Sequence, residues 1–266
     1  MRVVRYRDPE GSIHHGCRSA TGEIHLLAGD PCTGLVETGR PAAVSRLLAP
    51  VVPANIFCIG LNYGAHAAES RLSVPSAPIV FMKPTSAVAD PEQPIVLPAC
   101  RHREEVDYEG ELAVVIGRAA RNVDAEHALD CVAGYTCGND VSARHWQLHQ
   151  GGGQWCRGKG FDTFCPLGPA LVTPDELGDP QRLGIRTRLN GQTVQDHSTA
   201  DMIFGVAALI SFLSQDTTLL PGTVIMTGTP GGVGMARRPP VFLRPGDVVE
   251  VEIDGIGILR NPVQEA

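Results

Sequence analysis

Two glutamates at the head of an apolar run are the residues of this chain best placed to hold a cation. Glu109 and Glu111 precede a largely β-branched stretch, 112–116, that is typical of a covered strand. Side chains alternate along a strand, so the two glutamates share one face, roughly 6.5–7 Å apart. Like charges repel by about 4 kcal/mol at 4 Å and an effective dielectric of 20, and a hard divalent cation would reverse that sign. On this motif alone, a metal site and a solvated strand end fit equally well.

A third carboxylate, Asp140, ends a strand-like run near 131–137. It could share one ion with the two glutamates, or it could simply cap a short helix, as Ser142 also could. Three carboxylates without a thiolate or an imidazole would select Mg²⁺, Mn²⁺ or Ca²⁺ over Zn²⁺. An octahedral Mg²⁺ held by three protein oxygens keeps positions open for a chelating substrate and for water.

Candidate proton-transfer and charge-stabilising groups occur in two other segments. His66 and Glu69 are spaced i, i+3 on a short helix that Asn62 could cap, and such a pair can polarise a water. The commoner arrangement at this spacing is an exposed helical pair that contributes only about 0.2–0.5 kcal/mol. Lys159 lies between glycines, where it could pair with a substrate carboxylate or a developing enolate. A solvated surface lysine is the more common case.

The glycine-rich run 227–234 could bring backbone N–H groups close to an anion. It is not a P-loop, because no Gly-Lys-Ser/Thr follows, and it does not match G-x-G-x-x-G. Nucleotide binding is therefore not expected, and a plain loop with tight turns is the simpler interpretation. Serine-hydrolase elbows and H-E-x-x-H motifs are absent from the sequence.

The elements that must position these residues are mostly strands. Strands are predicted at 56–60, 78–84, 109–117 and 131–137, with hairpins at 186–194 and 249–259 around Asn-Gly and Asp-Gly turns. Helices are predicted at 42–48 and 125–129, and an amphipathic one at 202–213. Because strands outnumber helices without a βαβ rhythm, the fold class is α+β. We expect a small N-terminal β-rich segment at 1–48 and a main catalytic domain at 49–266.

Composition limits the possible partners. The 266 residues carry a net charge of −7 with 43% hydrophobic residues, as in an ordinary globular protein. The acidic balance argues against nucleic-acid binding. No apolar run is long enough to span a bilayer, so no membrane contact is expected. The N-terminus has no apolar signal region, and the eight cysteines form no C-x-x-C pair. A cytoplasmic protein with reduced thiols is expected.

Together, these motifs resemble the fumarylacetoacetate hydrolase family in content and order. The resemblance covers about residues 53–262 and is carried by six stretches: Gly60-Leu61-Asn62-Tyr63 with His66 and Glu69, Phe81-Met82-Lys83-Pro84, Glu109-Gly110-Glu111-Leu112, Asp140-Val141-Ser142-Ala143-Arg144 with Gln147, the run 159–169, and Thr227-Gly228-Thr229-Pro230. Some larger members have a further carboxylate ligand just upstream of the position of His66. Residues 60–65 contain no acid here, so the chain resembles the shorter, bacterial-type branch.

The resemblance implies a mixed β-roll with few helices, a homodimer, and a divalent metal. Carried over residue by residue, it implies one role for each of three groups. Metal ligands would be Glu109, Glu111 and Asp140; catalytic residues would be His66, Glu69 and Lys159; substrate-binding residues would be Arg144, Gln147 and Thr229.

The leading expectation for function is Mg²⁺- or Mn²⁺-dependent hydrolysis of a C–C bond in a 2,4-dioxo acid of the acylpyruvate type. Water activated by His66 and Glu69 would attack a carbonyl, and the carbanion would leave as an enolate stabilised by the metal and Lys159. The alternative on the same site is a lyase, an oxaloacetate-type decarboxylase or a keto–enol isomerase, including one like 2-hydroxyhepta-2,4-diene-1,7-dioate isomerase. A third, non-enzymatic hypothesis is a binding protein, which the intact set of acids and His66 opposes.

Overall fold

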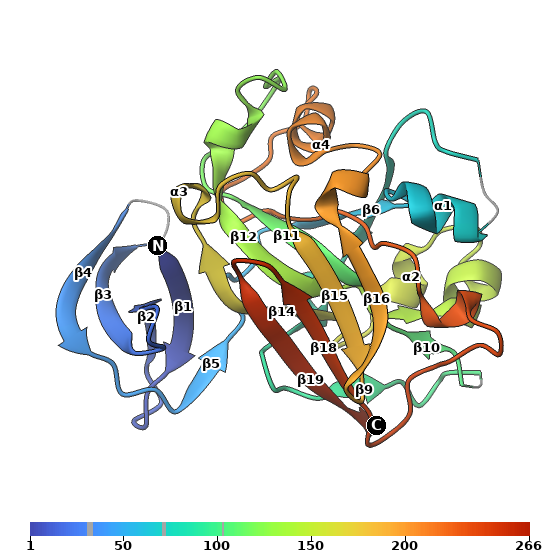
Figure 1. Cartoon of the computed structure of the whole chain (residues 1–266), viewed down its shortest axis with the longest axis horizontal. Helices are drawn as coiled ribbons and strands as arrows, with labels where there is room; N and C mark the ends of the chain where they lie inside the picture. Colours follow the sequence, from blue (N-terminus) through green and yellow to red (C-terminus); the bar gives the residue numbers. More distant parts are fainter. Residues whose placement is uncertain (31–33, 71–72, 103) are drawn as a thin grey trace.

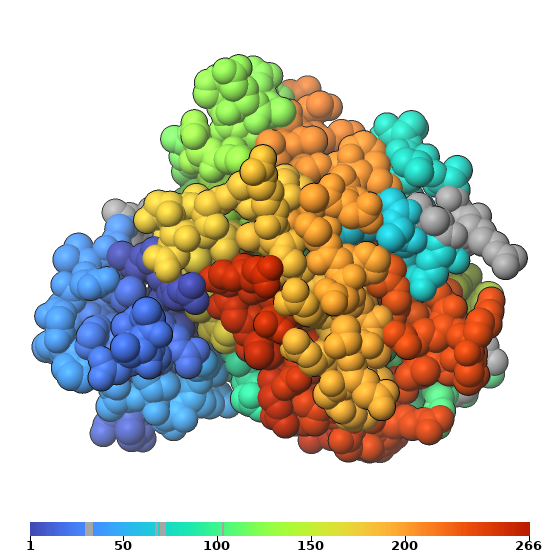
Figure 2. Space-filling view, viewed as in Figure 1, coloured from blue at the N-terminus to red at the C-terminus, as the bar shows by residue number. Residues whose placement is uncertain are grey.

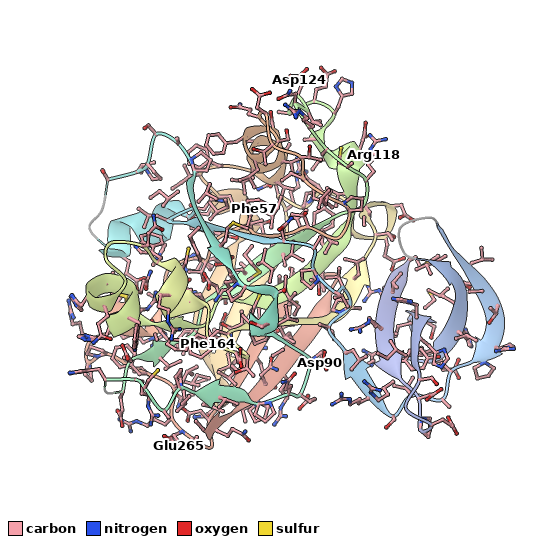
Figure 3. The ribbon with its side chains drawn as sticks, turned by 180° about the vertical axis from the view of Figure 1, so that it is seen from behind. Phe57, Asp90, Arg118, Asp124, Phe164 and Glu265 are labelled. Atoms are coloured by element: carbon pink, nitrogen blue, oxygen red, sulfur yellow. The ribbon has the colours of Figure 1, made fainter. Side chains whose placement is uncertain are left out.

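The computed structural model describes residues 1–30, 34–70, 73–102 and 104–266. Two lobes are visible, with the N-terminal strands gathered at one side of a larger body (Figure 1). The space-filling view shows the same two parts in contact (Figure 2). Asp90 lies near the boundary between them (Figure 3) and its Oδ1 accepts a hydrogen bond of 2.8 Å from the backbone N–H of Ala49.

The largest sheet runs through both lobes. Its described strands follow the order β4 (Gly34–Pro41), β3 (Ile24–Asp30), β2 (Ile13–Arg18), β1 (Arg2–Arg7), β14 (Cys165–Val172), β12 (Val132–Asn139), β11 (Gly110–Ile116), β17 (Val224–Met226), β6 (Ile56–Gly60) and β7 (Ile79–Lys83). Two short strands join off this path, β5 (Arg46–Leu48) beside β1 and β8 (Val88–Ala89) beside β14. Antiparallel pairing of β1 with β14 connects the lobes.

A second sheet packs against the first in the larger lobe. Its order is β16 (Gln192–Ser198), β15 (Gly184–Leu189), β18 (Val248–Ile253), β19 (Gly257–Glu265) and β9 (Ile95–Leu97). Two hairpins predicted from Asn-Gly and Asp-Gly pairs are confirmed as β15–β16 and β18–β19. A small pair, β10 (Val106–Asp107) with β13 (Ser142–Ala143), lies beside the acidic residues.

Helices are few and short in the described residues. They are α1 (Gly64–Ser70), α2 (Cys156–Lys159), α3 (Pro174–Leu177) and α4 (Val206–Leu213), with 3₁₀ turns η1 (Thr85–Ala87), η2 (Ala128–Cys131), η4 (Thr199–Asp201) and η5 (Gly234–Ala236) and a π-helical turn η3 (Trp146–Gln150). No helix in this part of the chain is long and apolar enough to cross a membrane. The predicted α+β class with mixed sheets and few helices is confirmed.

Strand β11 is buried along its whole length because both of its faces are covered. Leu112, Val114 and Ile116 pack in one cluster with α4, whereas Ala113 and Val115 pack in another with β6 and β17. The continuous apolar run predicted as a covered strand therefore reflects two cores that meet at one strand.

Three predicted helices differ from the structure. The predicted helix at 42–48 is wrong: its last part is β5, which pairs with β1 and buries Leu48. The predicted helix at 125–129 is replaced by the 3₁₀ turn η2. Helix α4 begins only at Val206, because Gly205 precedes it in extended backbone and Met202 pairs with Tyr63 in an isolated bridge. For β5 and for the start of α4, a tertiary partner outweighs local propensity.

Candidate metal centre and active site

The three predicted acids meet at one point. The register of β11 with β12 places Glu111 opposite Gly138 and Gly110 opposite Asn139, and Asp140 follows directly, its N–H donating to Glu109 O at 2.8 Å. One carboxylate oxygen from each of Glu109, Glu111 and Asp140 lies within 4.8 Å of the others, and all three residues are buried. The same-face prediction for the glutamates is consistent with this convergence.

Gly110 shows why this motif places a glycine between two glutamates. A Cβ at Gly110 would meet Thr187 Oγ1 at 2.1 Å, because that face of the strand packs closely on β15. The backbone N–H of Gly110 also donates to Gln195 Oε1 at 3.0 Å. The second sheet therefore holds the backbone from behind, while the flanking glutamates project to the opposite face.

Lys159 is buried against two of the acids. Its ammonium donates to Glu109 Oε2 at 2.9 Å, to Asp140 Oδ2 at 2.7 Å and to Ser142 Oγ at 2.7 Å, so all three N–H bonds are occupied. Burial alone would lower the pKa of Lys159, but Asp140 and Glu109 outweigh it and raise that pKa. Lys159 is thus a fixed cation, suited to stabilise negative charge rather than to accept a proton.

Lys83 is a site residue that sequence reasoning missed as an individual. Its ammonium donates to the carbonyls of Val141, Phe164 and Lys159 and lies 2.7 Å from Asp140 Oδ1. The N–H bonds point at the carbonyls, so Asp140 Oδ1 accepts no directed hydrogen bond within the described residues. A lysine at the end of an otherwise apolar strand, just before a proline, was the available signal.

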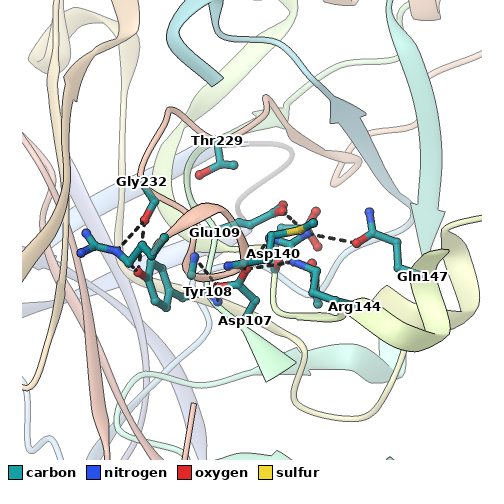
Figure 4. Close-up of polar contacts among 12 residues, drawn as sticks. Asp107, Tyr108, Glu109, Asp140, Arg144, Gln147, Thr229 and Gly232 are labelled. Carbon is teal, nitrogen blue, oxygen red and sulfur yellow. Dashed lines mark hydrogen bonds and ion pairs between the residues drawn. The ribbon is translucent and has the colours of Figure 1, made fainter. Parts of the chain in front are cut away.

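Arg144 is held by a further buried acid, Asp107, which no motif in the sequence singled out. Its Nε and Nη2 atoms contact Asp107 Oδ2 at 2.9 and 2.7 Å, and Nη1 contacts Gln147 Oε1 at 3.0 Å and Glu109 Oε1 at 2.6 Å (Figure 4). Asp107 also accepts the backbone N–H groups of Gly234 and Met235. Asp107 therefore fixes the guanidinium and the loop after the glycine-rich run together.

The charges around the acids differ from one carboxylate to the next. Burial would raise the pKa of Glu109, but Lys159 and Arg144 outweigh it and hold that pKa below its usual value. Burial, together with Asp140 and Glu109, raises the pKa of Glu111 well above its usual value. Glu111 receives one N–H, from Gly228 at 2.8 Å. Glu111 is thus a buried carboxylate with a single hydrogen-bond donor, and Asp140 Oδ1 accepts no hydrogen bond from the described residues. A bound cation would supply the missing partner for both.

His66 and Glu69 lie together on α1, with His66 Nδ1 3.6 Å from Glu69 Oε2. Glu69 also accepts the N–H of Gly232 at 2.9 Å, which ties it to the glycine-rich loop. Burial lowers the pKa of His66, so the neutral imidazole is favoured near pH 7. The predicted cap is wrong: Asp201 accepts the N–H of Ala65 instead, while Asn62 bridges Phe204 and Thr227.

The Thr229 hydroxyl is already engaged within the protein. It donates to Gly110 O at 2.9 Å and accepts from Gln195 Nε2 at 2.8 Å. Gln195 also donates to Pro230 O at 2.9 Å, so it joins β16, β11 and the glycine-rich loop. Thr229 lines the cavity, but its hydroxyl primarily positions the strand that carries the acids.

Many of these groups line one cavity of about 330 Å³. Its polar lining comprises His66, Glu69, Glu109, Arg144, Gln147, Lys159, Thr229 and Arg238, and its apolar lining includes Ile59, Phe81, Leu148, Trp155 and Met235. Seven of the nine predicted site residues thus line this cavity, and the other two, Glu111 and Asp140, lie with Glu109 in the acid cluster. Their individual roles remain predictions.

Known proteins resemble the chain over its full length. "Oxaloacetate tautomerase FAHD2A, mitochondrial" from Homo sapiens is 43% identical over 289 aligned positions, covering 99% of this chain and 91% of that protein. "Oxaloacetate tautomerase fahd2, mitochondrial" from Xenopus laevis is 53% identical over 218, covering 82% and 68%. Both names place these relatives in mitochondria, so the cytoplasmic location expected for this chain stays a prediction. The expected homodimer is a prediction as well.

Solved structures agree in fold. The 2-hydroxyhepta-2,4-diene-1,7-dioate isomerase from Mycobacterium marinum superposes with a TM-score of 0.85 at 40% identity, covering 100% of this chain and 98% of that one. The fumarylacetoacetate hydrolase from Exiguobacterium antarcticum gives 0.86 at 35% identity, with both chains fully covered. A family profile described as "Rv2993c-like, N-terminal" matches residues 1–50. The profile described as "Fumarylacetoacetate (FAA) hydrolase C-terminal" matches residues 55–264, and the chain belongs to this family.

Proposed function

We propose that this protein is a divalent-metal-dependent keto–enol tautomerase or isomerase that acts on 2-oxo dicarboxylic acids of the oxaloacetate type. The observation that carries the proposal is the cavity that Glu109 of the acid cluster lines together with the His66–Glu69 pair. The compounds in the relatives' names support it, since each is a 2-oxo acid or its enol with at least one further carboxylate. Among the alternatives expected from the sequence, these names favour isomerisation over hydrolysis.

The acid cluster fits a resident cation. Glu109, Glu111 and Asp140 would hold Mg²⁺ or Mn²⁺, which would act there as a Lewis acid for enolate charge. Lys159 adds a fixed positive charge beside two of these acids, and Arg144 adds a second one across Glu109. An enolate formed in this part of the cavity would therefore face preorganised cations rather than water.

His66 is the group best placed to move the proton. Its neutral imidazole takes a proton from the carbon next to the 2-oxo group, and the electron pair of that C–H bond forms the C=C bond of the enolate. Return of the proton to the oxygen completes the enol, and the reverse sequence gives the ketone. Water is neither consumed nor released. Glu69, held by the Gly232 N–H, orients the ring.

Hydrolysis would use the same pair differently, with a water deprotonated by His66 attacking a carbonyl. Product analysis separates the two. Freshly dissolved enol-oxaloacetate and a panel of acylpyruvates would be incubated with the enzyme and Mg²⁺ or Mn²⁺, and ketonisation would be followed by enol absorbance and by a dehydrogenase that accepts only the ketone. Mass analysis would test for carbon dioxide and for acid fragments.

We expect EDTA-sensitive acceleration of ketonisation without a change in substrate mass. His66→Asn should suppress it, and Arg182→Gln, a substitution at a surface residue whose side chain is 83% exposed, should not. Cleavage of acylpyruvates to pyruvate would instead establish the hydrolase hypothesis. Release of carbon dioxide from oxaloacetate faster than ketonisation would establish a decarboxylase.

A further inference from the structure

Arg238 lines the rim of the cavity and has no assigned role. We propose that its guanidinium binds the carboxylate at the far end of the substrate and so selects dicarboxylic over monocarboxylic 2-oxo acids. This inference rests on the proposed function, because it assumes that the 2-oxo acid end lies at the acid cluster. The inference depends on which cationic side chains in the cavity still have free N–H donors.

The two cations at the cavity floor are already neutralised. Lys159 uses all three N–H bonds on Glu109, Asp140 and Ser142. Arg144 has five N–H bonds, of which two contact Asp107, one contacts Gln147 and one contacts Glu109. These groups can stabilise charge that develops near them, but they leave at most one free donor for a second carboxylate.

Arg238 differs from both. Among the described residues it makes no hydrogen bond and no ion pair, so all five of its donors are free. The acids that share the cavity lining are otherwise engaged, Glu69 with Gly232 and His66, and Glu109 with Lys159 and Arg144. A free guanidinium fork matches a carboxylate in bidentate geometry.

Hydrogen bonds to distant elements hold the residues just before Arg238. The preceding residue, Arg237, donates to Tyr108 Oη at 3.2 Å and to Val194 O at 2.7 Å (Figure 4 shows Tyr108 and Gly232 in this cluster). Further back, Asp107 accepts the N–H of Met235 at 3.0 Å. The rim loop is thus anchored to Asp107, Tyr108 and Val194, and Arg238 lines the cavity.

Among the described lining residues, no other guanidinium has all of its donors free. Phe81, Leu148, Trp155 and Met235 are apolar. A substrate whose far end is a methyl group would suit these side chains, whereas a carboxylate placed against them would be desolvated without compensation. The charge of Arg238 therefore decides between the two classes.

The test uses two ligands with the same five-carbon chain, 2-oxoglutarate and 2-oxopentanoate, which differ only in a carboxylate against a methyl group. Binding to the Mn²⁺-loaded full-length protein would be measured by calorimetry and by fluorescence of Trp155 in the cavity wall. Arg238→Gln would be compared with Arg182→Gln, a substitution at a surface residue that pairs only with Asp179. Arg238→Lys would test rescue by a cation without the fork.

We expect Arg238→Gln to weaken 2-oxoglutarate binding about 5- to 20-fold, as loss of a charge-assisted pair at a partly exposed rim should do. Binding of 2-oxopentanoate should be unchanged, Arg238→Lys should be intermediate, and Arg182→Gln should match wild type. An unchanged ratio between the two ligands in Arg238→Gln, or equal weakening of both, would overturn the proposal.

The binding assay also keeps this inference separate from the proposed reaction. If the wild-type protein fails to tautomerise oxaloacetate, but Arg238→Gln loses the wild-type preference for 2-oxoglutarate, the proposed reaction is wrong and the carboxylate site stands. If tautomerisation is confirmed and the variant keeps the KM of wild type for oxaloacetate, the reaction stands and the role of Arg238 is refuted.

Discussion

Replacement of Glu111 by glutamine should have opposite effects on the metal-free and the metal-loaded protein. Glu111 is buried beside Glu109 and Asp140, and Lys159 contacts the other two acids but not Glu111 through any hydrogen bond. Glutamine keeps the shape and still accepts the N–H of Gly228. The substitution therefore removes one charge and little else.

The separation of the acids sets the size of the effect. Two unit charges at the 4.8 Å limit of this cluster repel by about 3.5 kcal/mol at an effective dielectric of about 20. Lys159 offsets part of this repulsion, and protonation of Glu111 would relieve it by another route. We therefore expect the metal-free Glu111→Gln protein to be as stable as wild type or up to about 3 kcal/mol more stable.

Thermal unfolding in EDTA and in Mn²⁺ would test this expectation. At a hundredfold excess over Kd, a ligand that binds only the folded state adds about 2.7 kcal/mol, or roughly 5–10 °C in Tm for a chain of this size. Wild type and Glu126→Gln, a control at an exposed acid, should show this rise and Glu111→Gln should not. A rise of wild-type size in Glu111→Gln, or a large loss of stability without metal, would refute the assignment.

Three further perturbations have defined outcomes. His66→Asn should lower kcat by about 10²–10⁴-fold while keeping the Mn²⁺-dependent rise in Tm, and a normal kcat would remove His66 from proton transfer. Because burial lowers the pKa of His66, the fall in kcat/KM with falling pH should have its midpoint below the ordinary histidine value, as the imidazole takes a proton. A profile that already declines above pH 7 with falling pH would contradict this cause. Gly110→Ala should destabilise the fold by about 1–3 kcal/mol in urea unfolding, because its Cβ would meet Thr187 Oγ1 at 2.1 Å, and an unchanged midpoint would show that β15 can move away.

The sequence predicted the elements that depend on local patterns. The apolar run after Glu111 and the two Asn-Gly and Asp-Gly hairpins are present, because alternation and turn chemistry act over a few residues. The segment 42–48 was mispredicted, since its strand conformation depends on β1, some forty residues earlier in the chain. Segment 42–48 is bounded by prolines and shows no alternation of polar and apolar residues, so nothing in it indicated pairing with β1.

The candidate site shows the same division. The acids and the His66–Glu69 pair could be selected because their types and spacing carry chemistry on their own. Lys83, Asp107 and Arg238 could not, because their significance lies in contacts with residues far away in the sequence, or in the lack of such contacts. From the sequence, Lys83 would be expected to be a solvated surface cation, whereas the fold buries it.

The hydrogen bonds of Gln195 to Gly110 and Thr229, and the close packing of Gly110 on Thr187, limit how this protein can change its substrates. Residues on the cavity floor are fixed from two sheets at once, so most substitutions there would damage the centre that does the chemistry. Met235 and Arg238 of the rim lie outside the strands of both sheets, and Asp107 holds this segment through backbone N–H groups, so these side chains can vary without loss of that contact. New specificities should therefore arise, in natural divergence or in a directed-evolution library, by exchange of rim residues around an unchanged floor.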